Sequence, residues 1–92
     1  MSMLLKTEAE VLDYGVDWSG WLETGDQIQT SSWAVEAGLT VGGQQHDDAS
    51  ATIWLSGGAA GTRYWVTNRI TTTAGRTAER AFRLRVVERR IQ

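Results

Sequence analysis

The sequence predicts an all-β protein, a sandwich of about six to seven short antiparallel strands. The first observation is that Thr, Val, Ile and Trp dominate the ordered segments and alternate there with polar residues. The second is that glycine-containing turns separate these segments at intervals of about ten residues, the spacing typical of sandwich domains. The chain has 10 Gly and no Pro, so its turns depend on glycine.

A glycine-rich corner is the third observation. Residues 55–64 read LSGGAAGTRY, so that one strand ends, the chain turns through three glycines, and a tyrosine opens the next strand. In immunoglobulin-like sandwiches a tyrosine near the start of strand F bonds back to the backbone at the E–F corner. The sequence therefore predicts an immunoglobulin- or fibronectin type III-like β-sandwich. Its structural corner comprises Tyr64, Gly57, Gly58 and Gly61.

The elements follow in order along one domain. We expect residues 1–10 to form a flexible N-terminal arm and residues 11–92 to form the sandwich. The expected strands cover residues 11–18, 27–35, 38–45, 50–55, 63–73 and 77–88. Opposite parity of Ile28 and Trp33 predicts a bulge between them, and the pair Gly42 and Gly43 predicts a second bulge or a turn.

Alternation within the strands predicts which side chains face the core. In the fifth strand Tyr64, Val66, Asn68 and Ile70 share one face, and we assign it to the core, where Asn68 needs hydrogen-bond partners. The same alternation places six large or charged side chains on the outer faces of the predicted sheets. This candidate interaction surface comprises Trp54, Trp65, Arg63, Arg69, Arg83 and Arg85.

Three interpretations of the outward tryptophans stay open. The N-terminal arm or the long arginine stems cover Trp54 and Trp65, or the two indoles belong to a protein–protein patch, or they form a platform for sugar rings. Trp18, Trp21 and Trp33 are expected in the core or at its edge.

Charge is unevenly placed along the chain. Residues 1–60 hold one Lys and nine acids, a net of −8, whereas residues 61–92 hold eight Arg and two Glu, a net of +6. Either acidic and basic strands neighbour one another within one sheet, or the domain is dipolar and docks head to tail on copies or partners. Nucleic-acid binding by the arginine-rich end is disfavoured, because the whole chain is acidic and no nucleic-acid-binding motif is present.

Residues suited to catalysis are scarce. The chain has no Cys and a single histidine, His46, beside Asp47 and Asp48, which are too few ligands for a metal site. The glycines at 57–61 lack the Lys-Ser/Thr of a phosphate loop. We therefore expect no enzyme activity, no catalytic residue, no metal and no cofactor. No apolar run suits a membrane span, and residues 1–12 do not suit a signal peptide.

Several strings resemble one family of small proteins from tailed-phage and prophage structural gene clusters, described as fibre–tail adaptor or head–tail neck-region proteins. The resemblance covers residues 6–90, and its most specific parts are the strings DWS and WLSGG. The strings are EVLDY (10–14), VDWS (16–19), WL (21–22), GDQI (25–28), ATIWLSGG (51–58), GT (61–62), VTNRI (66–70) and GRT (75–77). Many members carry prolines that this chain lacks.

The resemblance implies a non-enzymatic virion component that joins other phage structural proteins at the neck or tail, as a homo-oligomer or ring. It implies a place in the virion, or in the host cytoplasm during assembly, and contact with neither nucleic acid nor membrane. The alternative that the residues leave open is a carbohydrate-binding β-sandwich module that uses the outward tryptophans.

Overall fold

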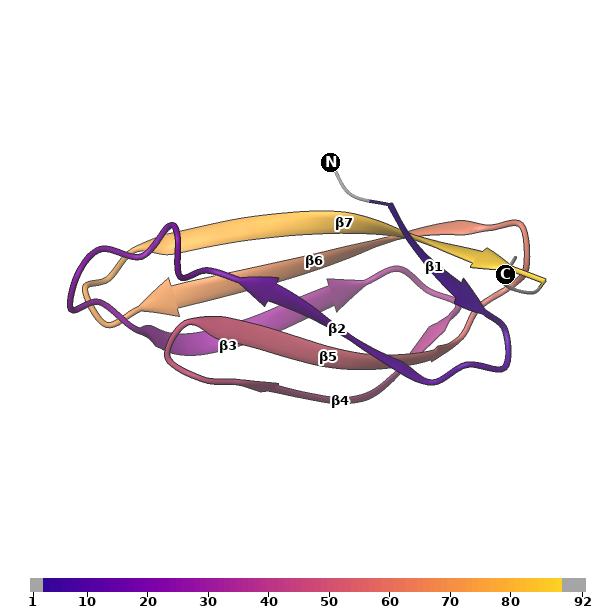
Figure 1. Cartoon of the computed structure of the whole chain (residues 1–92), viewed down its shortest axis with the longest axis horizontal. Coiled ribbons are helices and arrows are strands. Elements are labelled where there is room, and N and C mark those ends of the chain that lie inside the picture. Colours follow the sequence, from indigo (N-terminus) through magenta and orange to yellow (C-terminus); the bar gives the residue numbers. More distant parts are fainter. Residues whose placement is uncertain (1–2, 89–92) are drawn as a thin grey trace.

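The computed structural model describes residues 3–88, and these residues form seven strands and no helix (Figure 1). The prediction of an all-β fold is thereby confirmed. The strands are β1 (Met3–Thr7), β2 (Leu12–Asp17), β3 (Ile28–Val35), β4 (Leu39–His46), β5 (Ser50–Gly57), β6 (Arg63–Thr72) and β7 (Thr77–Val87).

The strands form two sheets. The larger sheet has the order β1-β7-β6-β3, and we call it sheet A; the smaller one, sheet B, has the order β2-β5-β4. All pairings are antiparallel except that of β1 with β7. If β2 to β7 are lettered B to G, the sheets contain the immunoglobulin groupings B-E-D and G-F-C. Membership of the immunoglobulin or fibronectin type III family stays a prediction.

The structure corrects the prediction of a flexible N-terminal arm. Residues 3–7 form β1, which runs parallel to the C-terminal half of β7 and pairs Leu4 with Leu84 (Figure 1). Lys6 is fully buried and lies next to Val86 in that pairing. The two-residue period points Leu4 and Lys6 inward, where Leu4 packs on the core. Residues 1 and 2 of the predicted arm lie outside the described residues.

Both predicted irregularities are present. The β3–β6 register shifts between Ile28 and Thr30, and the β4–β5 register shifts between Val41 and Gly43. Each shift inserts one extra residue, so that side chains beyond it return to the face that the core requires.

The core lies between the sheets in two clusters. The larger is built from Tyr14, Ile53, Leu55, Val66, Phe82 and Leu84, and the smaller from Trp18, Ile28 and Ile70. Asn68 is fully buried between them, and its amide oxygen accepts a hydrogen bond from the Trp18 indole at 2.8 Å. Its amide nitrogen donates to the Ser31 hydroxyl and the Ser32 carbonyl. These bonds offset the cost of burying the amide.

The corner between β5 and β6 carries the chain from sheet B to sheet A. Tyr64 is 4% exposed, and its hydroxyl accepts a hydrogen bond from the Ala59 backbone N–H at 2.9 Å. From the other side the Lys6 ammonium group donates to the carbonyls of Gly57 at 2.7 Å and of Thr7. Burial lowers the pKa of Lys6, and the charges of Glu10 and Glu8 oppose that effect. The corner is therefore pinned by side chains from β1 and β6.

Removing the Tyr64 hydroxyl should loosen this corner. Tyr64→Phe leaves the Ala59 N–H without its acceptor, and we expect it to lower the free energy of unfolding by about 1 kcal/mol. Urea denaturation measures the loss, and amide exchange should accelerate at Ala59. The Gly61 amide, which bonds to the Val86 carbonyl, is the internal control and should be unaffected. An unchanged stability would show that the hydroxyl does not hold the corner.

Two glycines of the corner form a matched pair for a second test. Gly58 has φ +92°, and a Cβ there would lie 2.6 Å from Val86 Cγ2, whereas Gly61 has φ +86° and open space around it. Both alanine variants incur the strain of a left-handed backbone, but only Gly58→Ala also crowds the core. We expect Gly58→Ala to cost about 1–3 kcal/mol more than Gly61→Ala in chemical denaturation. Equal losses would contradict the close packing.

Candidate interaction surfaces

Arginines and a tryptophan gather on the outer face of sheet A. Because Tyr64 and Val66 point into the core, Arg63 and Trp65 of β6 point outward. The register places Arg85 of β7 opposite Arg63, and Arg83 opposite Trp65. We call Arg63, Trp65, Arg83 and Arg85 the arginine face.

One carboxylate borders the arginine face, since Glu36 accepts a hydrogen bond from the Trp65 backbone N–H at 2.8 Å. Among the described residues, neither Arg63, Arg83 nor Arg85 has an ion pair. The Arg83 guanidinium carbon lies 4.4 Å from the centroid of the Trp65 ring, a cation–π contact that half-covers the indole. An arginine stem thus covers part of Trp65, as one of the sequence interpretations held, while Arg63 and Arg85 stay exposed.

Arg69 shares this outer face but differs in its partner. Its guanidinium lies 3.8 Å from the Glu79 carboxylate, its neighbour in the β6–β7 register, and both side chains are exposed. Such a surface pair adds little stability, but it offsets the charge locally. Arg69 is therefore placed on the predicted face and is separate from the unpaired arginines.

Trp54 lies on the opposite side of the domain. It belongs to β5, the central strand of sheet B, and points outward because Ile53 and Leu55 are fully buried. The six candidate residues are therefore split between two outer faces. Trp54 and Trp65 cannot form one joint sugar platform, because β5 and β6 belong to different layers.

The uneven placement of charge along the sequence becomes, in the fold, an uneven distribution of charged residues between the two sheets. Within residues 3–88, every Lys and Arg lies on β1, β6 or β7 or in the β6–β7 turn, and β2, β4 and β5 carry none. Sheet B carries Asp13 and Asp17 on β2. The interpretation in which acidic and basic strands neighbour one another within one sheet is therefore wrong. The cause is that β6 and β7 pair in sheet A while β2 joins sheet B.

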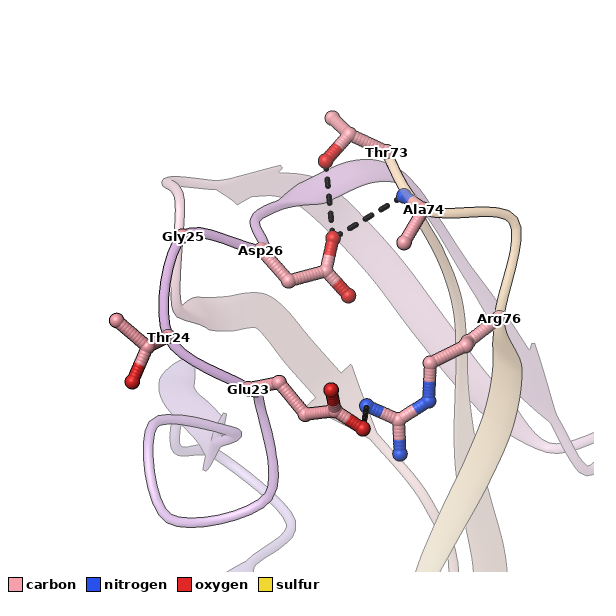
Figure 2. A pocket seen from close by; sticks show the side chains of 7 residues that line it. All are labelled: Glu23, Thr24, Gly25, Asp26, Thr73, Ala74 and Arg76. Atoms are coloured by element: carbon pink, nitrogen blue, oxygen red, sulfur yellow. Dashed lines mark hydrogen bonds and ion pairs between the residues drawn. The ribbon is translucent and has the colours of Figure 1, made fainter.

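A hollow of about 260 Å³ lies where the β2–β3 loop meets the β6–β7 turn (Figure 2). One Asp26 oxygen accepts hydrogen bonds from the Thr73 hydroxyl at 2.9 Å and from the Ala74 N–H at 3.1 Å. Below it in Figure 2, Arg76 and Glu23 form an ion pair at 3.4 Å. The Arg76 guanidinium also stacks at 4.0 Å on the Trp21 ring. These contacts hold the β2–β3 loop against the β6–β7 turn.

Electrostatics in this hollow favour an ionised Asp26. Burial raises the pKa of Asp26, but the hydrogen bonds from Thr73, Ala74 and Gln27 outweigh it and hold the pKa below its ordinary value. The second carboxylate oxygen is buried without a hydrogen-bond partner. The sequence analysis did not find this contact. The only available signal was an aspartate after a glycine in a loop, which is common in turns.

The acidic and histidine residues named from the sequence lie at the end of β4 and in the connection from β4 to β5. One Asp47 oxygen accepts hydrogen bonds from the backbone N–H groups of Ala49 and Ser50 and from the Ser50 hydroxyl, and these bonds lower its pKa. The exposed His46 ring contacts the Asp47 carbonyl at 3.0 Å. Across residues 3–88 the structure holds no group of three or more side chains able to bind a metal ion. Nor does this part of the chain contain a helix long and apolar enough to cross a membrane.

The fold and its surfaces define a small β-sandwich domain whose distinctive surface features are the arginine face on sheet A and the outward Trp54 on sheet B. A family model described as podophage GP4 fiber-tail adaptor protein gp77 matches residues 6–85, and the chain belongs to this family. The resemblance seen in the sequence strings is thereby confirmed, and the chain is a phage structural protein of the fibre–tail adaptor family. No curated protein matches the chain.

Acid should lower the stability of the fold by protonating Asp26. Because its pKa is held below its ordinary value, the ionised carboxylate stabilises the fold at pH above that value, and this stabilisation is lost as pH falls through the folded-state pKa. We expect Asp26→Asn to lower stability at neutral pH and to flatten the acid limb of a stability–pH curve. In the matched variant Thr73→Val, the pKa of Asp26 should rise in an NMR titration, because one donor is removed. A pKa that does not move would contradict this account.

Proposed function

We propose that this chain is a non-enzymatic adaptor at the neck or tail of a phage or prophage particle, where it joins other virion proteins. The observation that carries the proposal is the family match, which spans residues 6–85 and so includes nearly all the described strands. The arginine face supplies the contact. We place the protein in the virion, after assembly in the host cytoplasm.

Chemistry of the arginine face supports a protein partner with acidic groups. Tryptophan and arginine are the side-chain types that most often dominate interface energies. Arg63 and Arg85 are exposed, and Arg85 pairs on its other side with Leu5 of β1, which is 45% exposed. A partner that presents carboxylates around an apolar side chain would match this combination of charge and apolar surface.

Two alternatives have less support. A carbohydrate-binding module would stack sugars on an outward indole, but the structure separates Trp54 from Trp65, and Arg83 covers part of Trp65. A small hydrolase needs convergent titratable groups. The carboxylates of Asp26 and Asp47 are instead engaged in holding loop and turn backbone.

Binding to neighbouring virion proteins tests the proposal directly. The purified chain is titrated with each purified tail or neck protein encoded beside it, and calorimetry measures affinity. We expect at least one to bind, and Trp65→Ala or the double variant Arg63→Glu/Arg85→Glu to weaken it about tenfold or more. Arg69→Gln is the matched control, because Arg69 lies on the same face with its charge already paired, and it should bind normally.

Two results would overturn the adaptor proposal. One is the absence of binding to all such proteins together with absence of the chain from purified particles by mass spectrometry. The other is binding to glycans alone, lost in Trp54→Ala, which would establish the carbohydrate-binding alternative. A Trp65→Ala variant that unfolds would instead show that Trp65 is essential to the core, and the double arginine variant then carries the test.

A further inference from the structure

Trp54 lacks the arginine contact that most other tryptophans of the chain possess. Trp18, Trp21 and Trp65 each have an arginine guanidinium over the ring, at 4.5, 4.0 and 4.4 Å from the centroid. Trp33 packs edge-on against Phe82 on the core side. Trp54 is half-buried, and among the described residues no aromatic ring or cation packs on it.

The strands beside Trp54 leave its indole accessible. Its neighbour across β4 is Gly43, at the bulge, and a Cβ built on Gly43 would meet nothing within 4 Å. Its neighbour across β2 is Asp13, whose side chain is exposed. An open aromatic face next to a carboxylate is suited to a guanidinium group, which stacks on the ring and bonds to the acid.

The same chain presents guanidinium groups that lack such a site. Arg63 and Arg85 lie directly opposite each other on paired antiparallel strands, and both are exposed. Like charges in opposed positions destabilise a sheet, and neither arginine has an ion pair within residues 3–88. A carboxylate from outside would relieve this repulsion.

We propose that a second copy of this chain is the partner, and that the arginine face of one copy docks on the outer face of sheet B of the next. Arg63 or Arg85 then stacks on Trp54 and pairs with Asp13. Charge complementarity identifies the occupant, since the strands of sheet B carry Asp13 and Asp17 and no Lys or Arg, whereas the arginines of the arginine face have no ion pair within residues 3–88.

The geometry of this contact differs from that of a two-fold symmetric dimer. Because the two surfaces are on opposite layers of one domain, each copy keeps one free surface after docking, so that further copies can add. Such a contact produces a ring if the rotation closes and a filament if it does not. The inference rests on the same arginine face as the proposed adaptor contact, so a second copy and another virion protein compete for that face, and self-association is therefore measured without any other virion protein.

Defective variants of two kinds test the contact by complementation. Arg63→Glu/Arg85→Glu destroys the arginine face and leaves the Trp54 surface. Gly43→Gln fills the open side of the Trp54 indole without touching the core, and Trp54→Ala/Asp13→Asn removes the receptor itself. We expect wild type to associate with increasing concentration in sedimentation at about 0.01 M salt, and to dissociate at about 1 M, because salt screens the charges.

Mixing the variants with one another gives the decisive result. Each variant alone should be monomeric, whereas an equal mixture of the arginine-face variant with either receptor variant should form a one-to-one dimer and nothing larger. Each partner in the mixture retains the surface that the other lacks. Arg69→Gln is the control on the same face and should assemble like wild type.

Three outcomes would overturn the inference. They are a wild type that stays monomeric at low salt, a mixture that fails to dimerise, and association that Gly43→Gln leaves unchanged. None of these affects the adaptor proposal, which is tested separately by binding to tail and neck proteins and by the presence of the chain in purified particles. If Trp54→Ala/Asp13→Asn does not fold, Gly43→Gln supplies the receptor variant, since its added side chain points into open space.

Discussion

The pinned corner between β5 and β6 is the constraint on which the surfaces of this protein depend. It is held by the hydroxyl of Tyr64 from one side and by the buried ammonium group of Lys6 from the other. Gly58 makes the close approach possible, because any side chain there would meet Val86. The corner sends β5 into one layer and β6 into the other, so that Trp54 and Trp65 face away from each other.

The passage of the chain from sheet B to sheet A at this corner also separates the charged residues. The arginines of β6 and β7 are collected on sheet A because these strands form a hairpin, while the aspartates of β2 lie on sheet B. Burying such groups without partners would be costly, and the outer faces keep them in water. The result is a domain with two chemically different faces, which is a physical basis for contacts with acidic partners on one side and cationic partners on the other.

Local sequence pattern predicted most of the strands and their orientation. Alternation over 63–70 placed Tyr64 and Ile70 inside, and both are buried. The pattern did not predict a strand over residues 3–7, which form β1. The buried Lys6 is tolerated because its ammonium group donates to the carbonyls of Thr7, Glu8 and Gly57. The pattern also missed the contact of Asp26 with Thr73, since 47 positions separate the two residues in the sequence.

By itself, the sequence determined which side chains share a strand face, since a period of two residues is a local property of extended backbone. It also determined where the chain turns, through the glycines. The tertiary structure alone decided which layer each strand joins, and therefore that the outward indoles lie on opposite sides and that charge divides between the sheets. The physical reason is that strand pairing joins segments far apart in the chain, and backbone hydrogen bonds between strands are nearly independent of the side chains that alternate along them.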